Sequence, residues 1–187
     1  MSIDERESFC VPDLIEPVIG FRQWRLADDG LRSLTSKELW RSPRLDAQCR
    51  VGGHPHEVSP TARCSCGVYA WYEPCPRTAS AATRNIVAGA VVMWGAIELH
   101  VDGMRAQHCR IAAVALPLSR WGKRDRLRRA TALLGVPTVR HRDLWAAGRM
   151  YGVPVPAGLR PPRTRPCSLA VTDRRRPASY RFSDHRS

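Results

Sequence analysis

The sequence predicts an α+β domain in which two hairpins form a small antiparallel sheet or partial barrel and two helices follow. Three observations carry this prediction. Two apolar-containing segments are each interrupted by an Asp-Gly pair, which is typical of a β-hairpin. A segment rich in Gly, Pro, Cys and His separates the two hairpins. Two stretches with helical spacing of apolar residues come after the second hairpin.

The size and composition of the chain suit one globular domain with a tail. Its 187 residues are 43% hydrophobic and 25% charged, which excludes wholesale disorder. The longest apolar run, residues 86–97, has 12 residues, whereas a bilayer-spanning helix takes about 20. We therefore expect no membrane partner. The first residues are acidic and polar and lack the apolar stretch of a secretory signal, so we expect a cytoplasmic location.

Changes in composition along the chain predict its organisation. We expect an extended acidic lead-in over residues 1–19, a single α+β domain over 20–156 and a flexible Arg/Pro-rich tail over 157–187. The first hairpin is centred on Asp28-Asp29-Gly30, and residues 42–83 have the composition of loops.

The second hairpin gives the clearest pattern. It runs from Asn85 through a turn at Asp102-Gly103 to Leu116. A two-residue turn there makes one face of the hairpin apolar. The cross-strand pairs on this face are Val101 with Met104, Leu99 with Ala106, and Ile97 with His108. We expect His108 to be packed on this apolar face. The other face pairs Glu98 with Gln107 and His100 with Arg105, and we expect this face to be solvated.

Two helices are predicted after Pro117. The first covers Lys123 to Leu134 and ends at Gly135. Its buried side is formed by Leu127, Ala130 and Leu134. The second begins with Thr138 as its cap and continues through Met150.

A cluster of metal-binding residue types lies in the loop-rich segment 49–66. Zinc takes four thiolate or imidazole ligands in a tetrahedron, and Cys49, His56, Cys64 and Cys66 supply that set. His54 and Cys75 are alternative ligands. A segment with so little apolar content would gain its folding energy from the metal. Four protein ligands make a structural site, whereas a catalytic zinc keeps an open position and an adjacent acid, for which Glu57 is the candidate.

The motifs around this cluster resemble those of a family of uncharacterised proteins from actinobacteria and their phages. The resemblance covers roughly residues 20–155. It is carried by Gly20-Phe-Arg-x-Trp-Arg25, Cys49, His56, Cys64-x-Cys66-Gly67-Val68-Tyr69-Ala70, Val92-Met-Trp94-Gly95, His100-Val-Asp-Gly103-Met-Arg105-Ala106 and Tyr151-Gly-Val-Pro154. It implies no activity, and it supports the ligand set because the family repeats these Cys and His positions.

Positive charge is concentrated in the second half of the chain. The formal net charge is +13, yet residues 1–100 carry 11 basic and 12 acidic side chains while residues 101–187 carry 19 basic and 5 acidic. Such a surface attracts polyanions. We expect contacts with DNA or RNA phosphates from Arg124, Arg126, Arg128, Arg129, Arg140, Arg142 and Arg149. The two helices form either a helix-turn-helix or an amphipathic pair that covers the sheet with its arginines in solvent.

The sequence therefore favours a small cytoplasmic, zinc-stabilised binding or regulatory protein that contacts nucleic acid. The alternative is a protein–protein interaction module with a purely structural metal, and a metal-dependent hydrolase is the remote alternative. The sequence contains no phosphate-binding loop, no dinucleotide-binding fingerprint, no His-Glu-x-x-His and no Gly-x-Ser-x-Gly. A role without catalysis follows as the stronger prediction.

Overall fold

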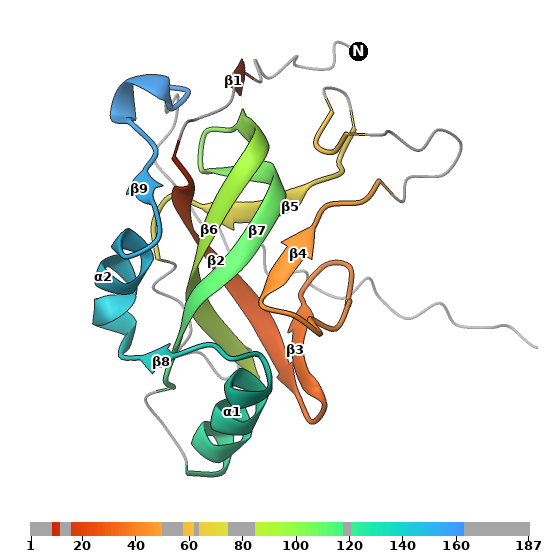
Figure 1. Ribbon diagram of the computed structural model, residues 1–187, viewed down its shortest axis with the longest axis vertical. Coiled ribbons are helices and arrows are strands. Elements are labelled where there is room, and N and C mark those ends of the chain that lie inside the picture. The colour runs from red at the N-terminus through yellow and green to blue at the C-terminus, as the bar shows by residue number, and fades with distance from the viewer. Residues whose placement is uncertain are drawn as a thin grey trace, which may run out of the picture.

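Four antiparallel strands close into a small barrel in the computed structural model, which describes residues 9–11, 16–49, 58–61, 64–74, 85–117 and 121–162. Strand β2 (Val18–Ala27) pairs with β6 (Ile86–Leu99), and β6 pairs with β7 (Gly103–Ala115). Strand β7 pairs with β5 (Val68–Trp71), which returns to β2 and closes the ring (Figure 1). The prediction of a mixed α+β fold with an antiparallel sheet and two short helices is confirmed.

Five short strands extend the barrel at its edges. β1 (Phe9–Val11), β3 (Gly30–Ser33) and β4 (Arg44–Asp46) are antiparallel to β6, β2 and β7 respectively. β8 (Thr138–Val139) and β9 (Val153–Pro154) run parallel to β7 and β2. β1 and β4 lie where the sequence predicted extended or loop structure, since runs this short carry no periodic signal.

Both hairpins form. In the first, Ala27 faces Gly30, so Asp28 and Asp29 make the turn, within the predicted Asp28-Asp29-Gly30 stretch. The second turn lies one residue earlier than predicted. In the second, the His100 N–H donates to the Gly103 carbonyl, and Leu99 faces Met104. Gly103 belongs to β7, and β5 passes so close to it that a Cβ there would lie 2.2 Å from the Ala70 carbonyl oxygen.

The shifted register overturns the expectation of a solvated polar face. Glu98 faces Arg105 directly, and their side chains are only 7% and 5% exposed. The prediction for His108 was also wrong. An irregularity between Trp94 and Ile97 turns His108 outward, where it stacks on Trp94 and its Nδ1 lies 2.6 Å from an Asp46 carboxylate oxygen.

The first helix covers one end of the barrel. α1 (Trp121–Leu133) lies below the strands in Figure 1, and its side chains join the barrel core. The predicted buried side is confirmed, because Leu127, Ala130 and Leu134 are all buried. The hydrophobic core of the barrel is thus sealed by a helix at this end.

The second helix packs against the outside of the barrel. α2 (Leu144–Arg149) buries Leu144 in a separate apolar cluster with Phe21, and Trp145 meets the Phe21 ring edge to face at 4.7 Å. It begins later than predicted because Thr138 pairs with Val114 in β8 instead of capping the helix. Since β8 separates the helices and each joins a different cluster, they do not form a helix-turn-helix. They form the predicted alternative, two helices that cover the sheet.

The described chain ends after a short 3-10 helix at Ala157–Leu159. The guanidinium of Arg160 lies over the Tyr72 ring at 4.7 Å and its Nε donates to the Val155 carbonyl. The rest of the predicted tail lies outside the described residues. Among the helices that are described, none has both the length and the apolar character that a membrane span requires.

Candidate metal centre

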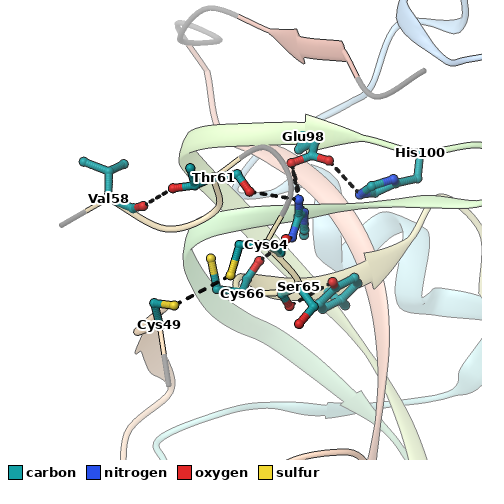
Figure 2. Close-up of polar contacts among 10 residues, drawn as sticks. Cys49, Val58, Thr61, Cys64, Ser65, Cys66, Glu98 and His100 are labelled. Atoms are coloured by element: carbon teal, nitrogen blue, oxygen red, sulfur yellow. Dashed lines mark hydrogen bonds and ion pairs between the residues drawn. The ribbon is translucent and has the colours of Figure 1, made fainter. Parts of the chain in front are cut away.

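Three of the predicted ligands come together beside the barrel. Cys49 follows β4, and Cys64 and Cys66 precede β5, so pairing of both strands with β7 brings distant segments side by side. Their sulfur atoms all lie within 4.8 Å of one another, and the Sγ atoms of Cys49 and Cys64 are 3.7 Å apart (Figure 2). Two thiolates on one tetrahedral zinc, each with a bond of about 2.3 Å, lie about 3.8 Å apart. The cluster has the spacing to hold a metal ion.

The other predicted ligands cannot be placed. His56, His54, Cys75 and the candidate acid Glu57 lie outside the described residues. The identity of the fourth ligand therefore stays a prediction.

A buried arginine shapes the segment that carries two of the cysteines. Nη1 of Arg105 donates to the Cys64 carbonyl and, at 2.9 Å, to the Cys66 carbonyl, and Nη2 donates to the Thr61 carbonyl at 3.3 Å (Figure 2). One guanidinium thus satisfies three backbone acceptors of the loop. Gly67 follows with a φ of 121°, and a Cβ there would approach Arg105 Cβ to 3.2 Å. These contacts hold the loop around the Arg105 side chain.

The charge of Arg105 is balanced by Glu98. Nε and Nη2 of the arginine both donate to Glu98 Oε2, at 3.0 and 2.5 Å. The other carboxylate oxygen of Glu98 lies 3.5 Å from His100 Nε2. Burial lowers the pKa of His100, with a further lowering from Arg105, and these effects exceed the raising effect of Glu98. Glu98, Arg105 and His100 therefore form a network of ionisable side chains that supports the loop carrying Cys64 and Cys66.

The thiols differ in how readily they would bind a metal. The backbone N–H of Cys66 lowers the pKa of Cys64, but burial and the neighbouring Cys66 and Cys49 thiols outweigh it, and the pKa lies above its usual value. A bound divalent cation reverses this balance because it replaces the thiol protons. Cys109 is different: it is fully buried in the barrel core, and burial raises its pKa to about 12 despite the opposing charge of Arg22. It is no candidate ligand.

The predicted nucleic-acid contacts fall on two surfaces. On α1, the exposed arginines are Arg124, Arg128 and Arg129. Arg126 is partly buried and paired with Asp28 at 2.8 Å. Arg140, Arg142 and Arg149 are exposed around α2, on a different side of the barrel (Figure 1). The structure describes all seven arginines and divides them between α1 and the region around α2.

Sequence reasoning missed the residues that support the site. The predicted register places Glu98 and Arg105 on one solvated strand face but opposite other partners, because it was set by the Asp-Gly pair alone. Opposite charges could have indicated the correct register. With the turn one residue earlier, Glu98 and Arg105 face each other between apolar pairs.

Comparisons with known proteins add no identity. No protein-family model, no curated protein and no solved structure matches the chain.

Proposed function

We propose that this chain is a zinc-stabilised cytoplasmic binding protein whose basic C-terminal half contacts the phosphates of nucleic acid. The observation that carries the proposal is the cluster of three thiols within 4.8 Å of one another, two of which lie on a loop shaped by the buried Arg105. Thiolates are the preferred ligands of structural zinc, and free thiols suit a reducing compartment. His56 completes the tetrahedron in this proposal.

A structural role for the metal fits the donor set better than a catalytic one. Three thiolates and one imidazole leave no open position for water or substrate. The metal would instead join the segment after β4 to the segment before β5. This proposal therefore sets aside the metal-dependent hydrolase.

Nucleic acid is the partner favoured by charge. Between residues 120 and 149 there are nine basic side chains and two acidic ones, Asp125 and Asp143. Asp125 lies 3.8 Å from Arg128 and Asp143 lies 3.7 Å from Arg142. No acidic side chain is paired with the exposed Arg124, Arg129, Arg140 and Arg149 among the ion pairs of the described residues. A positive surface of this kind binds phosphates without reading the base sequence.

The metal is tested by elemental analysis of protein purified without a metal-affinity tag. We expect about one zinc per chain. Cys64→Ser and Cys66→Ser should lose it, and Cys109→Ala is the matched control because Cys109 lies in the core away from the cluster. Folded wild-type protein without metal would refute the zinc proposal.

Nucleic-acid binding is tested by the salt dependence of affinity for a labelled oligonucleotide. Affinity should fall steeply between about 50 and 200 mM salt. Replacing the exposed Arg124, Arg128 and Arg129 with Gln should weaken binding and flatten the salt slope. The control replaces Arg41 and Arg44 with Gln, since both are exposed but belong to the first half of the chain. Affinity independent of salt would refute phosphate contact.

A protein partner is the second candidate, and one surface favours it. Met150, Tyr151 and Val153 are 75%, 42% and 38% exposed and follow one another after α2. Adjacent exposed apolar side chains are typical of interaction surfaces. Met150→Ser with Val153→Ser would abolish capture of a protein partner and leave oligonucleotide binding unchanged.

A further inference from the structure

A pocket of about 580 Å³ lies next to the loop that carries the cysteines. Its lining includes Arg22 of β2, Tyr69 and Trp71 of β5, and His100 and Asp102 of the turn between β6 and β7. Two of these residues also contact the metal-binding region. The Tyr69 hydroxyl donates to the Ser65 carbonyl at 2.9 Å, and His100 lies beside Glu98. The pocket and the cysteine loop are therefore held by some of the same side chains, Tyr69 and His100.

Two aromatic side chains are exposed at this pocket. Tyr69 and Trp71 are two residues apart on β5, so both point to the outer face of the strand, while Val68 and Ala70 point inward. They are 46% and 41% exposed, whereas Trp24 in the same barrel is fully buried. The hydrogen bond to Ser65 fixes the Tyr69 ring before any ligand arrives, which reduces the entropy lost on binding.

The pocket also contains a cation that lacks an anionic partner. Arg22 donates through Nη1 to the Tyr69 carbonyl and through Nη2 to Ser33 Oγ at 3.3 Å. Its Nε is buried without a hydrogen-bond partner, and no carboxylate of the described residues forms an ion pair with it. Burial lowers the pKa of Arg22, as expected for a poorly compensated charge. A negatively charged ligand would supply the missing partner.

We infer that this pocket binds an unpaired base of a single-stranded nucleic acid, with the base stacked on Tyr69 and Trp71 and an adjacent phosphate facing Arg22. A nucleotide combines a flat apolar face with a phosphate, and the pocket offers an aromatic surface beside a cation. The net charge of +13 favours a polyanion over an acidic peptide of few charges. This inference rests on the proposed nucleic-acid function and adds the strandedness of the partner.

The partner must be single-stranded because the aromatic side chains need access to the flat face of a base. Bases within a duplex are stacked on each other and cannot lie on a protein aromatic surface unless they are extruded. Phosphate contacts by exposed arginines occur with single strands and duplexes alike. A preference for single strands that depends on Trp71 therefore separates base stacking from simple charge attraction.

The test compares two probes and two matched variants. Fluorescence anisotropy measures the binding of two labelled probes to the full chain, an oligo-dT of about 12 nucleotides and a duplex of about 12 base pairs. Stacking of one base predicts that Trp71→Ala weakens oligo-dT binding at least about fivefold and leaves duplex binding unchanged. Tyr151→Ala is the control, because Tyr151 is an equally exposed aromatic residue, 42%, away from the pocket. It should alter neither affinity.

Further arms separate folding effects and competing outcomes. Trp71→Leu keeps an apolar side chain without an aromatic face, and it should lose oligo-dT affinity as Trp71→Ala does; Trp71→Phe should retain most of it. If all variants bind oligo-dT as tightly as the wild type, this inference is wrong and phosphate binding stands. If the wild type binds neither probe, the proposed function falls as well. Thymidine monophosphate binding as tight as oligo-dT would overturn the single-strand assignment in favour of a small nucleotide.

Discussion

Replacement of Arg105 by methionine tests whether a buried cation organises the cysteine loop. Arg105→Met keeps an unbranched apolar stem and removes the guanidinium. Glu98, 7% exposed at its side chain, then keeps its charge without the counter-charge, and the Thr61, Cys64 and Cys66 carbonyls lose their donor. The variant should be strongly destabilised because it leaves a buried charge uncompensated.

The size of the effect follows from the buried charge that is left behind. Removing one partner of a buried ion pair typically costs about 3–5 kcal/mol, because the remaining charge is desolvated without a counter-charge. Domains are stable by about 5–15 kcal/mol in total, so the loss is large enough to measure by denaturant unfolding.

The assay is urea unfolding at pH 7 followed by far-UV circular dichroism, with and without a zinc chelator. Arg149→Met is the matched control: Arg149 is an exposed arginine beside Trp145, and its loss should cost less than about 0.5 kcal/mol. Adding Glu98→Leu to Arg105→Met should recover much of the stability because it removes the buried charge. A loss below about 1 kcal/mol for Arg105→Met in both metal states would refute the reasoning.

Three further predictions concern the barrel and its ionisable groups. Burial lowers the pKa of His100, so the unfolded chain binds a proton at this residue more readily than the folded chain as pH falls below about 6.5, and the stability of the protein should drop there. His100→Asn should reduce the fall of the urea midpoint between about pH 7.5 and 5.5. An unchanged fall would contradict this prediction. Cys109 is fully buried with a pKa of about 12, so mass spectrometry should find it unlabelled by iodoacetamide in the native protein and labelled once urea unfolds it. Leu127→Ala should lower the free energy of unfolding by about 2–5 kcal/mol. Leu133 is 83% exposed on the same helix, so Leu133→Ala should lower it by less than about 0.5 kcal/mol. Equal losses would show that α1 does not seal the core.

The hairpins and the first helix could be predicted from the sequence because their signals are local. Asp-Gly pairs place turns to within one residue, and the spacing of Leu127, Ala130 and Leu134 identifies one side of a helix. The grouping of Cys49, Cys64 and Cys66 was also predicted, because thiol ligands at short spacing are recognisable by type. The contributions of His56, His54 and Cys75 stay predictions.

Tertiary structure decided the register, the barrel closure and the supporting network. The pairing of β5 with both β2 and β7 joins segments about 50 and 35 residues apart, and no local pattern specifies such a pairing. The observed register places Glu98 opposite Arg105, and the absence of a side chain at Gly103 leaves room for the Ala70 carbonyl of β5. Once the loop covered them, two charges that look solvated in the sequence became a buried ion pair.

The sequence by itself, through its Asp-Gly pairs, apolar spacing and residue types, therefore determined a small α+β protein with clustered thiols and a basic second half. Only the folded chain decided which charges lie in solvent and which aromatic side chains face a pocket. The physical reason is that burial belongs to the three-dimensional neighbourhood: Trp71 is exposed beside Arg22, while Trp24, in the same barrel, is fully buried.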